Sequence, residues 1–325
     1  MQSEPGHYVE NNSFIESVIN RASLGLGDDH SCVIVDNGSV VCWGGDWIGQ
    51  LGDGSAGSAR SYPSQTESLG SGRTAVAVSG GGSHTCAILD DGSVSCWGYN
   101  GHGQMGDGTT SDSNEPTQTA SLGSGRTAVA ISAGGSHTCA ILDDGSVSCW
   151  GYNYAGSLGN GESGNGADEN TPTQTASLGE GRTAVEISSG NEHTCVILDD
   201  GSVSCWGWND QGVLGDGTDT DRHTPTQTSS LGSGRTATEI SAGQANTCVV
   251  LDDGSVSCWG YNNWGQLGNG SVTMDGPGSY VPVQTASLGA GRTATKIATG
   301  DYHACAILDN GSVVCWGRNN AGQIG

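Results

Sequence analysis

Twelve cysteines fall into six pairs, and every pair has the same spacing, C-x9-C. Each pair brackets nearly the same string, which residues 84–98 show as HTCAILDDGSVSCWG. The pairs recur every 53 to 57 residues, so the chain consists of six copies of one unit. A period of this length is typical of a solenoid or a propeller. The pairs are Cys32 with Cys42, Cys86 with Cys96, Cys139 with Cys149, Cys195 with Cys205, Cys248 with Cys258, and Cys305 with Cys315.

Each bracketed string predicts a β-hairpin. In the second copy, Asp90 and Asp91 form the turn, and Gly92 takes the left-handed position that a side chain resists. Counting outward from this turn places Cys86 opposite Cys96, at a non-hydrogen-bonded pair whose Cα atoms lie within disulfide range. We therefore predict six disulfides, one in each of the hairpins at 32–42, 86–96, 139–149, 195–205, 248–258 and 305–315.

Two alternatives to the disulfides stay open, namely metal sites and reduced structural thiols. Metal sites would combine the cysteine pairs with histidines two residues upstream of the first cysteine, such as His84, His137, His193 and His303. C-x9-C is not a zinc spacing, and the fifth copy carries Asn246 in place of the histidine. We therefore expect no metal at the cysteines and no cofactor.

The cysteine pattern also bears on location, because disulfides persist in oxidising compartments. We expect an extracellular or cell-surface protein. The first twenty residues contain no apolar signal segment, and no apolar run approaches membrane-spanning length, so we expect no membrane insertion. The export signal is expected to be missing from this chain.

The composition favours short strands, and the net charge disfavours some classes of partner. Glycine accounts for 57 of 325 residues, which suits many short strands and tight turns. The net charge of −24 repels nucleic acid and anionic lipid, so we expect no nucleic-acid partner. Five of the ten basic residues recur in the string SLGxGRTA, and we expect each to pair with a carboxylate or with backbone carbonyls in its own repeat. They are Arg73, Arg126, Arg182, Arg235 and Arg292.

The repeat unit predicts about four short strands, formed by P-T-Q-T, by VAIS and by the two arms of the hairpin. The hairpin is apolar on both faces, so both faces must be covered. Small sheets packed face to face around an axis meet this requirement, and they form a β-propeller. The repeated tryptophans are expected to pack between such sheets. They are Trp43, Trp97, Trp150, Trp206, Trp259 and Trp316.

The pattern G-x-x-H-[TS]-C…DDGSVSCWG-x-N-x-x-G-x-L-G resembles the repeat of the regulator of chromosome condensation family, six times over nearly the whole chain. The resemblance implies a β-propeller. We predict an all-β fold, a propeller of six four-stranded blades over residues 23–325, and the alternative is a seven-bladed propeller that is truncated. Residues 1–22 are predicted to form a closing strand or a short helix, since Ser13 and Glu16 suit a helix capping box. Self-association through residues 1–29 is an alternative role for this end.

Length variation is confined to one loop of each unit. The repeat proline always lies 23 residues before the next first cysteine, whereas the distance from the repeat tryptophan to that proline varies from 19 to 23 residues. Equivalent loops of a propeller emerge on one face, which is the usual layout of a binding surface, and neutral drift of surface loops stays open as the alternative. The candidate binding residues are Trp47, Arg60, Tyr62, His102, Met105, Tyr154, Arg222, His223, Trp264, Met274 and Tyr280.

Two further features of these loops yield hypotheses. The residue after CWG is aromatic in four copies (Tyr99, Tyr152, Trp208 and Tyr261), which indicates either packing or an aromatic band. An aspartate-rich loop could supply oxygen ligands for Ca²⁺, although its spacing suits a calcium loop only loosely. The calcium candidates are Asp216, Asp219 and Asp221.

No catalytic pattern is present: the chain has no G-x-S-x-G elbow, no P-loop and no dinucleotide fingerprint, so we do not expect an enzyme. We predict a secreted, disulfide-stapled propeller that binds a protein or glycan through its variable loops. One alternative is a structural module that assembles head to tail at the cell surface. Another, implied by the resemblance, is an exported protein inhibitor of an enzyme. The resemblance also extends to a plant photoreceptor with tryptophans clustered near its repeat histidines, which this chain lacks at 82–83, 135–136 and 191–192.

Overall fold

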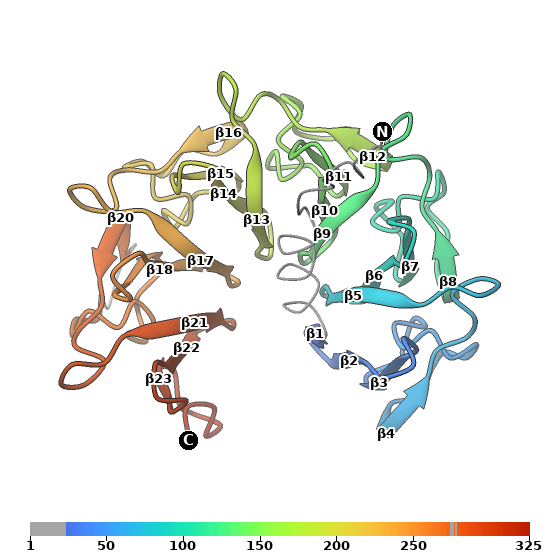
Figure 1. The fold of residues 1–325 in the computed structure, drawn as a ribbon, viewed down its shortest axis with the longest axis horizontal. Coiled ribbons are helices and arrows are strands. Elements are labelled where there is room, and N and C mark those ends of the chain that lie inside the picture. Colours follow the sequence, from blue (N-terminus) through green and yellow to red (C-terminus); the bar gives the residue numbers. More distant parts are fainter. Residues whose placement is uncertain (1–23, 274–275, 277) are drawn as a thin grey trace, which may run out of the picture.

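The computed structural model describes residues 24–273, 276 and 278–325. The elements of regular secondary structure in this range are all β-strands. The strands form six small antiparallel sheets arranged around an axis (Figure 1). The predicted six-bladed propeller is therefore confirmed. The N-terminal segment at 1–22 and the candidate Met274 lie outside the described residues.

The blades follow one another in chain order. Blade one contains β1 (Leu24–Leu26), β2 (His30–Ile34), β3 (Val40–Gly44) and β4 (Arg60–Gln65), and blade two contains β5 (Ala75–Gly80), β6 (His84–Leu89), β7 (Val94–Gly98) and β8 (Ser113–Gln118). Blade three contains β9 (Ala128–Ala133), β10 (His137–Leu142), β11 (Val147–Gly151) and β12 (Glu169–Gln174), and blade four contains β13 (Ala184–Ser189), β14 (His193–Leu198), β15 (Val203–Gly207) and β16 (Arg222–Gln227). Blade five contains β17 (Ala237–Ala242), β18 (Asn246–Leu251), β19 (Val256–Gly260) and β20 (Ser279–Gln284), and blade six contains β21 (Ala294–Thr299), β22 (His303–Leu308) and β23 (Val313–Gly317).

Each blade is a simple meander whose neighbouring strands are consecutive in the chain. In blades two to five the repeat segment VAIS and its variants form the innermost strand, the hairpin forms the middle pair, and the segment with the repeat proline forms the outer strand. Within the described residues, blade six has three strands and the other five blades have four.

The six predicted disulfides are confirmed, one in each blade. In every blade the two cysteines face each other directly across the hairpin ladder, with Cα atoms 4.0 to 4.1 Å apart. All twelve cysteines are used, so neither the metal-site alternative nor the free-thiol alternative describes this structure. The bonds join Cys32 to Cys42, Cys86 to Cys96, Cys139 to Cys149, Cys195 to Cys205, Cys248 to Cys258, and Cys305 to Cys315.

The predicted hairpin turn is confirmed as well. The amide of Gly92 donates to the carbonyl of Leu89 at 2.8 Å, and Gly92 has a φ of 77°. A Cβ on Gly92 would also collide with the side chain of Thr127 in the next blade. Glycine is therefore required here both by the backbone and by the neighbouring blade.

The core lies between the blades, since the hairpins of blades two to five are buried on both faces. One face of blade two carries Cys86, Ile88 and Val94, and it packs against Leu142 and Trp150 of blade three. The indole nitrogens of the tryptophans in blades two to six donate to backbone carbonyls in the loops of the preceding blade, at 2.7 to 3.0 Å. The prediction that the repeated tryptophans pack between blades is confirmed for these five.

A second set of contacts joins neighbouring blades through histidine and threonine. Nε2 of His84 lies 2.9 Å from Oγ1 of Thr138 in the next blade, and the hydroxyl of Thr138 in turn donates to the carbonyl of Gln104. The same contact recurs from blades one, three and four. Blade five breaks the series, because Asn246 replaces its histidine and Ala304 replaces the threonine of blade six. The histidine and its threonine are therefore lost together.

The five repeated arginines form ion pairs on the face that holds the hairpin turns, which we call the lower face. Arg126 contacts Asp143 at 3.4 Å and Asp144 at 2.6 Å, both in the turn of its own blade. The other four arginines make equivalent contacts with the turns of their own blades. The predicted carboxylate pairing is confirmed. These side chains are about 40% exposed, so each pair contributes little to stability, about 0–1 kcal/mol.

Among the described residues the ring is open between blade six and blade one, whose β23 and β3 lie on opposite sides of the gap in Figure 1. Side-chain exposure agrees with this arrangement. Ile307 and Val313 of blade six are 44% and 60% exposed, whereas their equivalents Ile88 and Val94 are 2% and 1% exposed. Blade six thus presents an apolar face that in every preceding blade is covered by the next one.

Candidate binding face

The face opposite the hairpin turns, the upper face, brings together two kinds of loop. The first is the short loop that joins the innermost strand to the repeat histidine or asparagine, as at 81–83. The second is the variable loop that follows CWG, as at 99–112. The two loops lie at the same end of each blade because β6 begins where β7 ends, with His84 opposite Gly98.

One backbone hydrogen bond fixes the two loops against each other in every blade. The amide of the residue after CWG donates to the carbonyl of the residue before the repeat histidine or asparagine, at 2.6 to 2.9 Å. We call these residues the paired positions. Because the bond uses no side-chain atom, the residues at the paired positions are free to differ. From blade one to blade six they are Gly45 with Asp29, Tyr99 with Ser83, Tyr152 with Ser136, Trp208 with Glu192, Tyr261 with Ala245, and Arg318 with Tyr302.

The paired positions and their neighbours form clusters of touching aromatic rings. The His102 ring lies 6.1 Å from Tyr99 and 4.8 Å from Tyr152, centroid to centroid, and Tyr152 stacks on Tyr154 at 6.4 Å. Further round the face, Tyr261 contacts Tyr302 edge to face at 6.1 Å. Of the two interpretations of the aromatic residues after CWG, the structure supports an aromatic band for Tyr99, Tyr152 and Tyr261, whose rings contact neighbouring rings. Trp208 instead packs against the core between blades four and five.

A cavity of about 500 Å³ opens on the upper face at blades four to six. It is lined mainly by Glu192, Trp208, Gln211, Gln244, Tyr261 and Tyr302. Burial raises the pKa of the Glu192 carboxyl above its usual range, and the negative charge of Asp221 raises it further.

A second cavity, of about 650 Å³, lies at the axis and is lined by the short loops of all six blades. Its lining includes three carboxylates, Asp28, Asp29 and Asp301, against one guanidinium, Arg318. The pKa of Asp28 is raised by burial and then by the charges of Asp301 and Asp29. The axis is therefore electronegative on this side.

The predicted binding residues divide by exposure. Trp47, Tyr62, Tyr154 and Trp264 are 43% to 64% exposed, so they are available to a partner. Tyr62 lies on the outer strand β4 and not in the loop before it. Met105 was predicted wrongly, because it is fully buried and packs in the core between blades two and three.

The remaining predicted residues are held by intramolecular polar contacts. Ion pairs join Arg60 to Asp53 at 3.2 Å, Arg222 to Asp216 at 2.6 Å and, when its imidazole is protonated, His102 to Asp168 at 2.9 Å. Nδ1 of His223 lies 3.2 Å from the hydroxyl of Ser163, and the hydroxyl of Tyr280 donates to Asp219 at 3.5 Å. Arg60, Arg222, His223 and Tyr280 lie at the start of outer strands, so only part of the predicted set belongs to loops.

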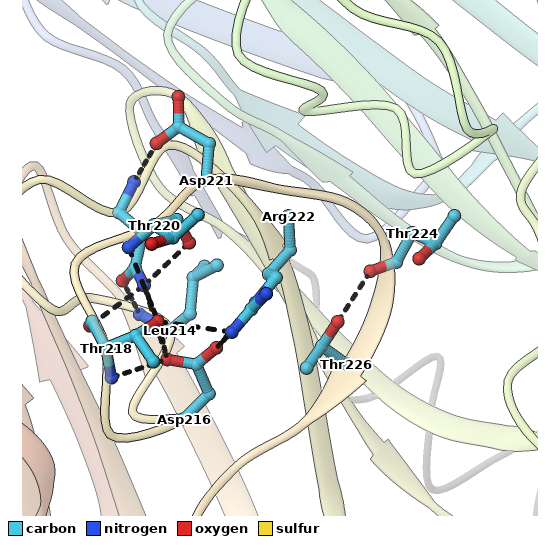
Figure 2. A network of polar contacts seen from close by, with 9 residues as sticks. Leu214, Asp216, Thr218, Thr220, Asp221, Arg222, Thr224 and Thr226 are labelled. Carbon is cyan, nitrogen blue, oxygen red and sulfur yellow. Dashed lines mark hydrogen bonds and ion pairs between the residues drawn. The ribbon is translucent and has the colours of Figure 1, made fainter.

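The aspartate-rich loop uses its carboxylates to hold its own backbone (Figure 2). Asp216 accepts hydrogen bonds from the amide and hydroxyl of Thr218 and from Arg222. Asp221 instead accepts from the amide of Asn209 at 2.7 Å. Within the described range no group of three or more histidine, cysteine, aspartate or glutamate side chains converges to hold a metal ion, so the calcium hypothesis gains no support here.

Glu192 and Tyr302 were not among the predicted binding residues. The prediction rested on variation in loop length, and these residues occur where the length is constant. The sequence marks these two positions by substitution among the copies. The residue before the repeat histidine or asparagine is acidic in two copies, small in three and aromatic in one. Comparing the copies position by position would have found them.

Comparison with known proteins agrees with this architecture. The family model described as the regulator of chromosome condensation (RCC1) repeat matches residues 37–88, 91–141, 144–197, 200–250 and 253–307. A second model of the same description matches six shorter segments, from 22–46 to 294–323. The chain belongs to the RCC1-repeat family.

Curated relatives of this RCC1-repeat chain include a receptor and a ligase. The chain is 32% identical over 304 residues to the ultraviolet-B receptor UVR8 of Arabidopsis thaliana, covering 93% of the chain and 66% of the receptor. It is 32% identical over 254 residues to the human E3 ubiquitin-protein ligase HERC2, covering 77% of the chain but only 5% of the ligase. The chain thus spans just under two thirds of the receptor and a small part of the ligase.

Solved structures show the same fold. Yeast RCC1 (Prp20), solved bound to Kap60, has a TM-score of 0.78 at 19% identity over 91% of this chain and 69% of that one. Human WBSCR16 has a TM-score of 0.80 at 22% identity over 94% of this chain and 78% of that one.

The described residues of the RCC1-repeat chain contain no helix with the length and apolarity to cross a membrane.

Proposed function

We propose that this chain is a non-enzymatic binding module that recognises a protein or glycan partner through its upper face. The observation that carries the proposal is the set of paired positions. Six equivalent backbone sites carry five different pairs of side chains. Tyr99 and Tyr152 contact the ring of His102, and Tyr261 and Tyr302 meet edge to face in the lining of an open cavity. Half-buried aromatic residues with room for a ligand are good anchors for partners.

We further propose that the module works in an oxidising extracellular or cell-surface setting. The support is that all twelve cysteines are disulfide-bonded and none is free. The test is the intact mass of protein isolated from its source with thiols capped. Six bridges reduce the mass by about twelve hydrogen masses, and twelve capped thiols would contradict the proposed location.

The relatives support a regulatory or protein-binding role. Yeast RCC1 was solved with Kap60, and a second structure of the same protein concerns its binding to Gsp1p and histones. An exported inhibitor of an enzyme would be one form of the same role. Those structures share only the fold with this chain, so their partners do not identify the partner of this chain.

The experiment that tests the upper face compares substitutions on the two faces. In Tyr99→Gly/Tyr152→Gly, both aromatic residues take the glycine that blade one carries as Gly45. This variant should lose partner binding in a screen of secreted proteins and glycans. Arg126→Ala on the lower face is the control, and it should bind as the unmodified protein does. Equal loss from both faces, or loss from the lower face alone, would refute the proposed surface.

A second candidate, head-to-tail assembly, is favoured by the open ends of the ring. Blade six exposes Ile307 and Val313, and blade one exposes Val35 on the face that other blades use to cover their predecessors. A second copy could therefore extend the series of blade contacts. Assembly predicts a native mass that rises with concentration and that Val313→Lys returns to the monomer value. A constant monomer mass would rule it out.

A further inference from the structure

We propose that the cavity at blades four to six is a subsite for a cationic side chain, lysine or arginine, of a protein partner. The inference rests on the proposed upper-face binding function and deepens it by naming the chemistry that is recognised. Three aromatic rings and one carboxylate, contributed by three successive blades, line this one opening.

The three aromatic residues are placed by the repeat itself. Trp208 and Tyr261 follow CWG in blades four and five, and Tyr302 precedes the repeat histidine of blade six. Their amides or carbonyls take part in the recurring backbone bond of the paired positions, with Trp208 bonded to Glu192 at 2.9 Å and Tyr261 to Ala245 at 2.8 Å. The rings are therefore held on a rigid backbone, which suits recognition of a cation by aromatic faces.

The carboxylate supplies the charge. Glu192 is half-buried in the cavity wall, and its pKa is raised by burial and by the like charge of Asp221. No cationic side chain of the described residues acts on this pKa in the opposite direction. A carboxylate that is partly desolvated and repelled by a neighbour is stabilised by an incoming cation.

The chain already contains one example of the contact. The guanidinium of Arg318 lies 5.6 Å from the centroid of the Tyr302 ring and 5.3 Å from that of Trp264. Arg318 does not line the cavity, so it does not fill the proposed subsite. The remaining lining includes Gln211 and Gln244, whose side-chain carbonyl oxygens can accept hydrogen bonds from an ammonium or guanidinium group.

Charge decides between a cation and a sugar, which also stacks on aromatic rings. The only charged residue lining the cavity within the described range is Glu192, and the whole chain carries a net charge of −24. This potential concentrates basic ligands at the surface and does nothing for a neutral sugar. A basic segment of a protein is therefore the favoured ligand.

The test uses the peptide acetyl-Gly-Lys-Gly-amide, its norleucine analogue and methyl glycosides, each titrated into the whole chain by ligand-observed NMR. The lysine peptide should bind, and the norleucine peptide and the glycosides should not. Glu192→Gln should weaken lysine binding about tenfold, the value of one charged hydrogen bond. Tyr302→Ser, which installs the serine that blades two and three carry at this position, should weaken it as well.

The matched control is Glu180→Gln, which removes the same charge from an exposed turn on the lower face. It should leave lysine binding unchanged, and thermal melting should show that all three variants fold. Equal weakening by Glu180→Gln and Glu192→Gln would mean non-specific attraction and would overturn the subsite. Binding of the norleucine peptide or of glycosides in place of lysine would also overturn it, yet would leave the upper face as a binding surface. Full partner binding by Tyr99→Gly/Tyr152→Gly would instead refute the broader function.

Discussion

Mild acid should destabilise this propeller through four buried histidines. Burial lowers the pKa of His30 and His137 to about 4 and that of His84 and His193 to about 3. The contacts explain the direction. In each case the threonine hydroxyl donates to a backbone carbonyl, so the histidine must donate from Nε2. Nδ1 is then buried without a partner, and protonating it would bury both a donor and a charge.

The magnitude follows from proton linkage. The unfolded chain protonates near the ordinary histidine pKa of about 6.5, whereas the folded chain does not protonate until the pH approaches 4 or 3. Between these values the unfolded state binds more protons, so stability falls as the pH falls. At pH 5 each of the four histidines costs about 2 kcal/mol relative to pH 7, or about 8 kcal/mol together.

The assay is thermal or denaturant unfolding of the oxidised protein between pH 7 and pH 5. The double variant His84→Asn/Thr138→Ala copies the natural combination of Asn246 and Ala304. It should fold and should lose about a quarter of the pH dependence, about 2 kcal/mol. A flat stability profile from pH 7 to pH 5, or a double variant with the full slope, would refute the reasoning.

The carboxyl groups also affect how the stability of the folded state depends on pH. The pKa values of Asp28, Asp46, Glu192 and Asp221 are raised mainly by burial, so their protonation on folding favours the folded state as the pH falls and partly offsets the histidines. Carboxyls with lowered pKa values, such as that of Asp91, lose their contribution only below the ordinary range near 4. The double variant isolates the histidine effect, because it changes none of these carboxyls.

Three further predictions concern the scaffold. Gly92→Ala should lower the melting temperature by an amount equivalent to about 1–3 kcal/mol, and Gly125→Ala should lower it less. Both glycines have a positive φ, but only Gly92 faces a side chain of a neighbouring blade. Equal effects of the two substitutions would contradict the collision argument. Replacing Cys86 and Cys96 together by alanine should cost about 2–4 kcal/mol in denaturant unfolding, and no loss would mean that the disulfide does not constrain the unfolded chain. Arg126→Ala should cost less than about 1 kcal/mol by the same measurement, since its ion pairs are exposed, and a larger loss would show that they are stronger than their exposure indicates.

The fold was predictable because each repeat contains its own constraints. The hairpin turn, the opposed Cys86 and Cys96, and the two apolar faces of the hairpin all follow from the alternation of side chains along a strand. Six copies at a period of 53 to 57 residues left few architectures that could cover both faces. The assignment of Arg126 to the turn of its own blade followed from the same repetition.

The site was only partly predictable, because a linear sequence does not show which way a loop residue points. Met105 occurs in a variable loop but occupies the buried position that leucine holds in other copies, such as Leu158. Asp216 suited a calcium ligand by composition, yet its carboxylate binds the loop backbone and Arg222. The position of Glu192 is marked by substitution among the copies, but the cavity that it lines is assembled from three blades that meet only in the folded ring.

The paired positions separate recognition from stability in an unusual way. Since a main-chain bond joins them, a mutation at either position alters the ligand surface without removing the contact that holds the loops together. Duplication of the unit would then supply spare copies in which these positions could diverge independently. For protein engineering, the upper face offers a set of addressable sites at which residues can be exchanged between blades, and a new specificity would require no redesign of the scaffold beneath it.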